Sequence, residues 1–375
     1  MPSLSIIMPC HNRAHDLIKC LEAYDQQVGA GDFEIIAVDD ASSDSTYQVL
    51  SSYRPSRYTL RVERLATNQG PAAARNRGIE LAASPLVLFV GDDILPASTL
   101  VWGHTVAHKI YRSKDIAVLG RIAWPEDMPV NTLMTHVGGV GAQQFSYHYL
   151  VDGQEYDFRH FYTSNISIKT EHLRTLSTWF ATDFRYAAYE DAELAYRLSK
   201  RGLHIRYASA LLAYHYHYYN IWTFRERQRK AGMMACLLIG KHPRLMVQFR
   251  SHLTRIAALI THTQAVPAQV ILELEDMLCH LLSLYEWNPN ELLDQAYLGS
   301  LEYFYYDGVI SGWFGKSALA QRLRGTHAKK YLIPALSWFF DEAKQRNIPT
   351  IDASRLDWLV KGQHKALFQC PSSIA

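Results

Sequence analysis

The feature that most constrains this chain is a regular alternation of short apolar runs with helix-like segments in its first 90 residues. Four segments have the apolar character of strands, and three helical patterns separate them: residues 4–9, 33–40, 58–65 and 85–90. This β-α-β-α-β-α-β order predicts an α/β fold, with a mostly parallel sheet and helices on both faces. In such sheets ligands bind at the carboxyl ends of the strands.

The rest of the chain is less regular. A strand-like stretch at residues 164–168 precedes a helix pattern over residues 190–201, whereas residues 125–165 look irregular. Residues 203–217 look extended. In the first helix pattern, the 3.6-residue period predicts one buried face, made of Leu17, Ile18, Leu21 and Tyr24.

A change of character between about residues 235 and 250 predicts two domains. We expect an α/β domain over residues 1–240 and a C-terminal α-helical accessory domain over residues 241–375. The second domain carries amphipathic helix patterns and many aromatic residues. It could shape acceptor binding, mediate assembly into a homo-oligomer, or form a packed helical layer with aromatic core residues.

Composition narrows the class of protein. The formal net charge of +2 argues against nucleic-acid binding through bulk positive charge. No apolar run approaches the ~20 residues that span a bilayer, and the first residues lack a secretory signal pattern. The five cysteines are scattered and form no CxxC pair, which favours a reducing compartment. We therefore expect a cytoplasmic protein, with peripheral contact at the inner face of the plasma membrane left open.

Two pairs of carboxylates follow strand-like segments. Asp39 and Asp40 end the second segment, and Asp92 and Asp93 follow the fourth. Because parallel strands share one carboxyl edge, both pairs are expected at the same edge of the sheet. Carboxylates there can accept hydrogen bonds from a base or ribose, or hold Mg²⁺ or Mn²⁺. The alternative for each pair is a structural turn or helix cap.

Three further motifs are candidates for chemistry. The loop from Asn68 through Gly70 opens a helix whose free N–H groups could bind a phosphate, with Arg75 adding charge. Glu190 and Asp191 open another helix, as dipole partners or as a general base. His215 and His217 share one face of an extended segment and could bind a metal, although single histidines are more often structural.

Taken in order, these motifs resemble family 2 glycosyltransferases with the GT-A fold, over about residues 4–245. Residues 5–13 are similar to that family's opening strand and loop, with His11 in place of the usual tyrosine. Residues 38–44 resemble the segment that holds the base and ribose. Residues 68–78 resemble the NxGxxxARNxG stretch. Gly91-Asp92-Asp93 stands where the family carries its DxD motif, with Gly91 replacing the first carboxylate.

The resemblance assigns roles to individual residues. It implies that Asp191 is the catalytic base, with Glu190 as its acidic neighbour. It implies a divalent cation, Mn²⁺ or Mg²⁺, held by Asp93, His215 and His217. Donor contacts are implied for ten residues: Pro9, His11, Arg13, Asp39, Asp40, Asn68, Gly70, Arg75, Asp92 and Asn165. For Asn165, the alternative is that its amide satisfies backbone groups.

The implied activity is inverting transfer of a hexosyl or N-acetylhexosaminyl group from a nucleotide-diphosphate sugar. UDP is the family's commonest carrier, and the acceptor would be a glycan, polysaccharide or lipid-linked hydroxyl of the cell envelope. A nucleotidyltransferase would need a glycine-rich loop after the first strand, which residues 10–13 lack. A non-catalytic protein that binds sugar nucleotides or glycans stays open because of Gly91.

A short basic segment, residues 224–230, leaves one more question open. Arg225 and Arg229 would share a helix face. That face could contact a diphosphate, an anionic acceptor or a membrane surface. The alternative is an ordinary solvated helix face, because four positive charges make a short run.

Overall fold

The structure of this chain is a computed structural model. It describes residues 2–141, 143–242 and 245, together with residues 294, 297, 298, 301, 302, 304–306, 308 and 309. The chain divides into two compact units, of which the first comprises residues 1–130 and 142–218, and the second residues 131–141 and 219–375. This division differs from the predicted boundary between residues 240 and 241.

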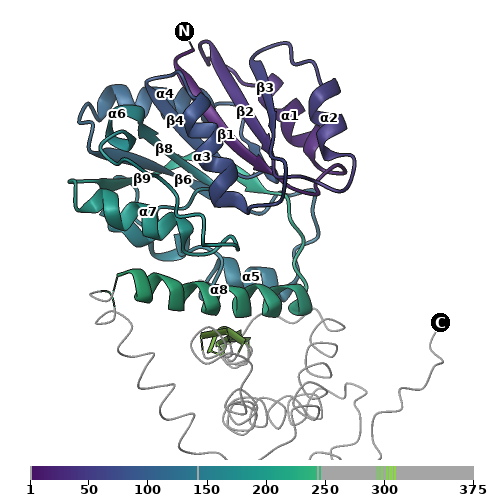
Figure 1. Cartoon of the computed structure of the whole chain (residues 1–375), viewed down its shortest axis with the longest axis vertical. Helices are drawn as coiled ribbons and strands as arrows, with labels where there is room; N and C mark the ends of the chain where they lie inside the picture. The colour runs from purple at the N-terminus through teal and green to yellow at the C-terminus, as the bar shows by residue number, and fades with distance from the viewer. Residues whose placement is uncertain are drawn as a thin grey trace, which may run out of the picture. The chain divides into compact units, whose positions relative to one another are not determined.

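In the described residues, nine strands form one sheet in the first unit (Figure 1). Eight follow one another in the order β3-β2-β1-β4-β8-β6-β9-β5, and β7 pairs with β9. Their bounds are β1 Leu4–Cys10, β2 Phe33–Asp39, β3 Thr59–Arg64, β4 Leu86–Val90, β5 Ile94–Pro96, β6 Ile116–Ala123, β7 Glu155–Tyr156, β8 Asn165–Lys169 and β9 His204–His215. The strands β1 to β4 are mutually parallel where they pair, as predicted.

The other half of the sheet is mixed. The strand β8 runs antiparallel to both β4 and β6, while β6 and β9 pair in parallel. The register between β6 and β9 shifts between Gly120 and Arg121. This irregularity precedes the ends of β6 and β9, where Trp124 and His215 lie. The sequence pattern predicted neither the reversal of β8 nor the bulge.

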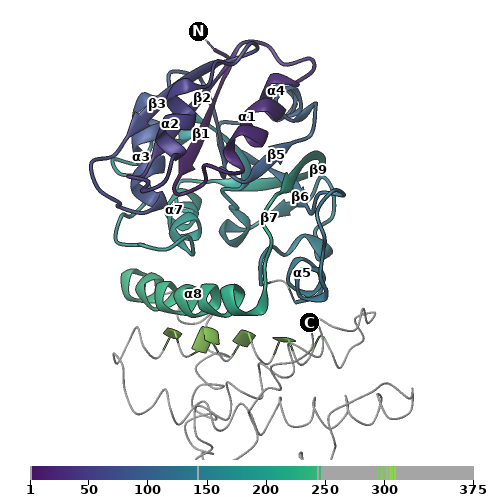
Figure 2. The ribbon, with the colours of Figure 1, turned by 90° about the vertical axis from the view of Figure 1, so that its right-hand side faces the viewer.

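Helices cover both faces of the sheet, as predicted. The helices of the first unit are α1 Leu17–Asp25, α2 Thr46–Ser52, α3 Pro71–Leu81, α4 Leu100–Ile110, α6 Thr170–Leu173 and α7 Glu190–Ser199. Buried residues of α1, α2 and α4 join one hydrophobic core, and those of α3, α6 and α7 join the other. Figure 2 shows α1 and α4 on one side of the sheet and α3 and α7 on the other.

The central strands show why the sheet has two cores. Successive side chains of a strand point to opposite faces. Accordingly Ile6 and Met8 of β1 enter one core, whereas Ile7 enters the other. The prediction for α1 was wrong at one position: Cys20 occupies the buried face, and Ile18 is 43% exposed.

The segment predicted to be irregular, residues 125–165, contains a helix that belongs to the second unit: α5, Thr132–Gly138. The Asn131 side chain caps it by accepting a hydrogen bond from Met134 N–H. The long helix of this unit is α8, Ile221–Lys241, which opens with a capping box between Asn220 and Thr223.

The placement of α8 in the second unit has a packing reason. A side chain added at Gly232 would clash with the backbone of Tyr305, so the two segments touch through glycine. Arg225 is buried, with its guanidinium 5.4 Å from the Trp222 ring centre and 5.2 Å from that of Phe304. The predicted exposed face of Arg225 and Arg229 is therefore wrong for Arg225. Most of the predicted helical region, residues 241–375, lies outside the described residues.

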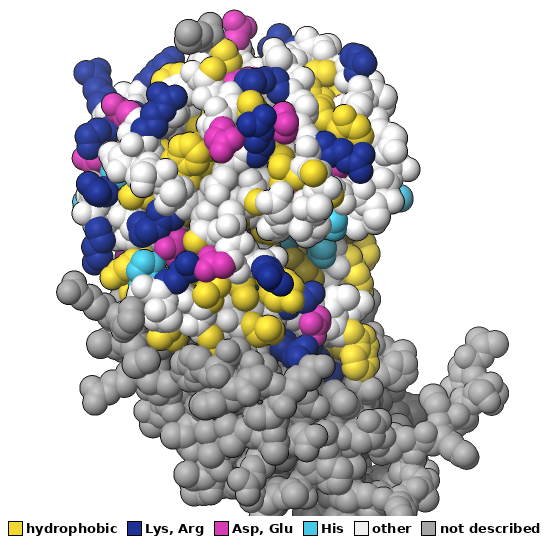
Figure 3. All heavy atoms as spheres, in the orientation of Figure 1, with side chains coloured by type: hydrophobic (Ala, Val, Ile, Leu, Met, Phe, Trp, Pro, Cys, Tyr) yellow, Lys and Arg dark blue, Asp and Glu magenta, His cyan; other side chains and the backbone are white. Residues whose placement is uncertain are grey.

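The surface and the cysteines add two points. On the face drawn in Figure 3, Lys and Arg side chains lie among Asp and Glu side chains. Cys10, Cys20 and Cys236 are free and buried, while Cys279 and Cys370 lie outside the described residues. Within the part of the chain that the structure describes, no helix combines the length and apolar character needed to span a bilayer.

Candidate active site

The acidic edge of the sheet begins with two buried aspartates that organise loops. Asp39 ends β2; its carboxylate accepts a hydrogen bond from Ser42 N–H and pairs with Arg64 at 3.1 Å. The two carboxylate oxygens of Asp40 accept hydrogen bonds from Gln69 N–H and Gly70 N–H, each at 2.8 Å. In this structure both carboxylates accept hydrogen bonds from backbone N–H groups of nearby loops, as in the alternative interpretation of a structural turn or cap. Their contacts with a nucleotide stay a prediction.

The loop that Asp40 holds lies next to His11. The Asn68 side-chain amide is 3.2 Å from the His11 ring, whose Nδ1 is 3.0 Å from Asp40 O. Gly70 has a φ of +86°, a left-handed conformation that glycine adopts readily, and Pro71 then opens α3. Pro9 pairs with Val38 in the sheet, at the end of β1. The structure thus brings the predicted donor-binding residues of three segments to one edge.

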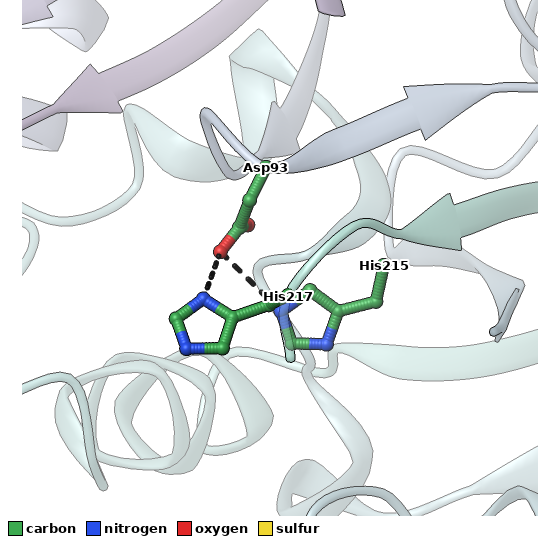
Figure 4. A group of neighbouring side chains, drawn as sticks. All are labelled: Asp93, His215 and His217. Carbon is green, nitrogen blue, oxygen red and sulfur yellow. Dashed lines mark hydrogen bonds and ion pairs between the residues drawn. The ribbon is translucent and has the colours of Figure 1, made fainter. Parts of the chain in front are cut away.

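Asp92 and Asp93 follow β4 at the same edge. His11 N–H donates a hydrogen bond to Asp92 Oδ2 at 3.2 Å, which connects this pair to the loop after β1. Asp93 Oδ2 lies 3.4 Å from His215 Nε2 and 3.2 Å from His217 Nδ1 (Figure 4). One ligand atom from each of these three residues lies within 4.8 Å of the others. Segments far apart in the sequence therefore form one carboxylate–imidazole cluster.

Arg13 inserts its guanidinium into this cluster. Its Nη2 is 3.2 Å from Asp93 Oδ2, its Nε is 3.5 Å from Asp92 Oδ1, and its Nη1 is 3.2 Å from His217 Nδ1. A pocket of about 390 Å³ opens beside it, lined in part by Arg13, Tyr216 and His217. A positive side chain therefore faces both the acidic pair and an open space.

The two aspartates differ in charge state. Burial raises the pKa of the Asp92 carboxyl to about 7, and the nearby Asp93 charge adds to the rise. Burial also acts to raise the pKa of Asp93, but His215, His217 and Arg13 outweigh it. They hold the pKa of Asp93 well below its ordinary range. Asp93 is thus the ionised member of the pair.

These residues fit a divalent cation. Carboxylate oxygens suit Mn²⁺ and neutral imidazole is a common metal ligand, and both the Asp93 and His217 side chains retain solvent access, at 13% and 29%. Three protein ligands would leave coordination positions for substrate oxygens or water. The chemistry of this donor set supports Asp93, His215 and His217 as the group that would hold the ion.

A third acidic pair, Glu190 and Asp191, opens α7. Glu190 Oε1 is 2.8 Å from Arg75 Nη1, and the two side chains are only 3% and 8% exposed. Phe180 lies against the same guanidinium, with 5.5 Å between the Arg75 Cζ and the ring centre. The predicted contact of Arg75 with a phosphate is thus not what this structure shows. Its charge is paired inside the protein, and Glu190 serves as its partner rather than as an open catalytic group.

Asp191 differs from its neighbour because it keeps some solvent exposure. Burial raises the pKa of its carboxyl to about 7, with the Glu190 charge raising it further and Arg75 lowering it. A general base works best when its pKa lies near the operating pH. The environment of Asp191 therefore suits proton transfer at neutral pH.

Aromatic side chains near His215 form a cluster that was not among the sequence motifs. We call Trp124, Phe145, Tyr147 and Tyr162 the aromatic cluster. Trp124 stacks on His215, with ring centres 5.5 Å apart, and Phe145 lies 6.0 Å from His215 and 5.4 Å from Tyr162. Burial raises the pKa of Tyr162 to about 12, and Asp191 is among the charges that contribute. The aromatic cluster thus packs against His215, and its Tyr162 lies within electrostatic range of Asp191.

Asn165 lies inside the sheet. It is fully buried, and its amide donates to Leu211 O at 2.8 Å and to Arg121 O at 3.1 Å. Its Oδ1 lies 2.9 Å from His104 Nε2. The predicted role near the donor or acceptor is therefore wrong, and the structural alternative holds. Asn165 satisfies backbone groups at the bulge where the register of β6 and β9 shifts.

Backbone strain marks the same places. Among the described residues, three non-glycine residues have positive φ: Asn12 at 50°, Ala41 at 53° and Tyr189 at 65°. They are direct neighbours of Arg13, Asp40 and Glu190. Such conformations cost about 1–2 kcal/mol each and concentrate at functional sites. Strain next to Arg13, Asp40 and Glu190 is an independent sign that these segments are functional.

Comparison with known proteins gives the class. Residues 5–177 match the sequence model of the family Glycosyl transferase family 2. Over these residues the chain is similar to family 2 glycosyltransferases. The matched residues include both aspartate pairs of the strand edge, whereas Asp191 and the two histidines lie beyond them.

Individual relatives agree with this family. A PGL/p-HBAD biosynthesis glycosyltransferase of Mycobacterium bovis (strain BCG / Pasteur 1173P2) is 37% identical over 101 residues, covering 26% of this chain and 39% of that protein. A validoxylamine A glucosyltransferase of Streptomyces hygroscopicus subsp. jinggangensis is 28% identical over 274 residues, covering 66% of this chain and 62% of that protein. The chain thus spans less than two thirds of the length of either relative.

A solved structure supports the fold. A mannosyltransferase from Pyrobaculum calidifontis, in complex with GDP-Man and Mn²⁺, has a TM-score of 0.53 and 16% identity. The alignment covers 84% of this chain and 88% of that one. The predicted fold class is confirmed: a mixed α/β fold of the GT-A type with a central, mostly parallel sheet.

Proposed function

We propose that this chain transfers a sugar from a nucleotide-diphosphate sugar to an acceptor hydroxyl, with inversion at the anomeric carbon. The observation that carries the proposal is the gathering of Asp93, His215 and His217 into one cluster beside Arg13, with the charge of Asp191 acting on Tyr162 of the aromatic cluster that packs on His215. The Asp93–His215–His217 group suits a diphosphate and its counter-ion, and Asp191 suits the role of proton acceptor. The similarity to family 2 glycosyltransferases supports the same reaction class.

The diphosphate end would hold a divalent cation on Asp93, His215 and His217. When bound, such an ion offsets the negative charge that develops on the leaving diphosphate. Arg13 supplies a positive side chain in the same place, and His11 and Asn68 line the neighbouring loop. These groups bind and orient the nucleotide end of the donor.

The acceptor end depends on Asp191. Its carboxylate takes the proton of the acceptor hydroxyl while that oxygen forms a bond to the anomeric carbon. The bond between the anomeric carbon and the diphosphate oxygen breaks in the same step, so the products are a glycoside and a nucleoside diphosphate. Glu190 and Arg75 hold the start of α7, and the pKa near 7 lets Asp191 accept and release a proton at neutral pH.

The donor and acceptor follow less directly. A UDP-sugar is our expectation, and the mannosyltransferase of similar fold was solved with GDP-Man and Mn²⁺, which makes a GDP-sugar the second donor to test. Glycan, polysaccharide and lipid-linked hydroxyls are the proposed acceptors. Whether the sugar is hexosyl or N-acetylhexosaminyl is tested by the same panel.

A thermal-shift screen with UDP- and GDP-sugars, with and without Mn²⁺, identifies the donor, because a ligand that binds the native state raises Tm. Hydrolysis of the best donor is then measured with Mn²⁺ and with EDTA. We expect Mn²⁺-dependent release of the nucleoside diphosphate.

The second candidate is a non-catalytic sugar-nucleotide or glycan-binding protein, which Gly91 favours by removing one carboxylate from the DxD position. Stabilisation by a donor without any hydrolysis or transfer would support that binder. If the wild-type protein releases the nucleoside diphosphate and Asp191→Asn does not, a non-catalytic binder is excluded.

A further inference from the structure

Arg13 occupies the place where a cation would balance the acidic pair. Its guanidinium contacts Asp92, Asp93 and His217, with the closest separations at 3.2 Å. Its backbone N–H is fixed separately, by a 2.7 Å hydrogen bond to Thr46 Oγ1. The side chain can therefore change position while the loop after β1 stays in place.

A divalent cation would need the same acceptor atom. Asp93 Oδ2 lies 3.2 Å from Arg13 Nη2, 3.4 Å from His215 Nε2 and 3.2 Å from His217 Nδ1. An ion bound by this oxygen and the two imidazoles would lie next to the guanidinium, and like charges at such distances repel strongly. Asp93, His215 and His217 therefore cannot bind the divalent ion and the Arg13 guanidinium equally well at the same time.

The structure offers Arg13 an alternative position. The side chain is 24% exposed and lines the pocket of about 390 Å³. Asp16, Tyr216 and His217 line the same space. A guanidinium that leaves Asp93 can move into this space, where a diphosphate would be a strong, bidentate partner.

We propose that Arg13 and a divalent cation are alternative partners of Asp93, so that metal binding releases Arg13 to the donor diphosphate. The proposal rests on the proposed function, because it gives that site a donor with a diphosphate. It makes metal and donor binding mutually supportive, since each favours the released position of Arg13. Without metal, Arg13 balances the two aspartates and keeps the cluster assembled.

The test is Mn²⁺ binding alone, measured by electron paramagnetic resonance of free Mn²⁺, with no nucleotide present. We expect Arg13→Gln to bind Mn²⁺ about threefold to fivefold more tightly than wild type, because the competing state is removed. Lys19→Gln is the matched control. It removes the same charge nearby, but Lys19 pairs with Asp127 and lies over the Tyr216 ring rather than contacting Asp93.

Three results would overturn the exchange. They are unchanged or weaker Mn²⁺ binding by Arg13→Gln, an equal gain in Lys19→Gln, and no Mn²⁺ binding by any of the proteins. If Arg13→Gln does not fold, Arg13→Lys provides the test. Lysine keeps the charge but cannot bridge three groups, so its Mn²⁺ affinity should exceed that of wild type. Wild-type affinity in Arg13→Lys would then contradict the exchange.

The outcome is separable from the proposed function. Sugar transfer is measured with donor and acceptor present, whereas this experiment contains only protein and Mn²⁺. A protein that shows the expected change in Mn²⁺ affinity but no transfer with any donor would refute the proposed function and keep the exchange. Active wild type with no gain in Arg13→Gln would do the reverse.

Discussion

Two acidic doublets in this domain share a design and differ in how tightly they are sealed. In each doublet one carboxylate makes the closest ion pair with an arginine, Asp93 with Arg13 at 3.2 Å and Glu190 with Arg75 at 2.8 Å, and Arg13 also lies 3.5 Å from Asp92. In each, the other carboxylate, Asp92 or Asp191, has a pKa raised to about 7. The Arg75–Glu190 pair is buried, whereas Arg13 keeps 24% of its side-chain surface in solvent.

The difference teaches that similar sequence doublets can have opposite mechanical roles. A sealed ion pair is fixed, because separating it would leave a charge in a poorly solvated place. An ion pair open to solvent can exchange partners at little cost. We therefore interpret Arg75–Glu190 as a fixed ion pair that holds the start of α7 in place, and Arg13–Asp93 as an ion pair that can exchange its partner.

The largest effect is expected from Asp191→Asn, which removes the proposed base. Transfer should fall by about 10²–10⁴-fold, the usual contribution of general base catalysis, while donor binding is retained. A radiolabelled-sugar assay measures transfer, and the thermal shift with donor measures binding. Glu171→Gln is a control, because Glu171 is also an acid in a first helical turn but is exposed on α6. Near-normal transfer by Asp191→Asn would remove Asp191 from the mechanism.

Next in size is the loss of stability in Arg75→Ala. Removing one partner of a buried pair leaves Glu190 uncompensated, and such changes cost about 3–5 kcal/mol. Urea unfolding measures the change in free energy. Arg77→Ala is the matched control on the same helix, since Arg77 is 38% exposed and pairs with Glu63 and Glu80 at the surface. If both variants lose equal stability, the contrast between sealed and open pairs is wrong.

A smaller effect is expected on the pH dependence of kcat. The base must be ionised, so kcat should rise with pH through a midpoint near the Asp191 pKa of about 7. Glu190→Gln removes a negative neighbour that raises this pKa. Arg75, which lowers the pKa, stays in place, so the midpoint should move to lower pH. A midpoint that stays in place or moves upward would show that Glu190 does not act on the base.

The same shift has a consequence for stability. The folded-state pKa of Asp191 lies above its ordinary value, so its contribution to stability is greatest at low pH. That contribution is lost as pH rises through about 7. The loss grows as pH rises from the ordinary carboxyl range towards about 7, and it is complete once the base is fully ionised in the folded protein.

Local signals explain why much of this design could be predicted from sequence. The apolar runs of β1, β2 and β4 and the proline at the start of α3 are features of a few adjacent residues. They correctly predicted the parallel half of the sheet and its acidic edge. Because parallel strands share one carboxyl edge, the nearness of Asp40 to the segment at Asp92 follows from topology.

Partners distant in sequence were not predictable in the same way. Arg75 and Glu190 are 115 positions apart, and helix periodicity on α3 or α7 contains no information about their contact. The aromatic cluster depends on the irregular path of residues 124–162. Asn165 has its role because of the β6–β9 register shift. These features arise from tertiary packing, which overrides local propensity.

The smallest effect is expected from Arg13→Gln on stability without metal. Its contacts are partly solvated, and such ion pairs contribute about 0.2–1 kcal/mol. The carboxylate pair can also take up a proton at Asp92 when the guanidinium is gone, which limits the cost of leaving two charges together. Urea unfolding should therefore show a loss of at most about 1 kcal/mol, well below that of Arg75→Ala. A loss as large as that of Arg75→Ala would mean that Arg13 is a fixed structural partner, and the exchange of cations at Asp93 would no longer follow from its position.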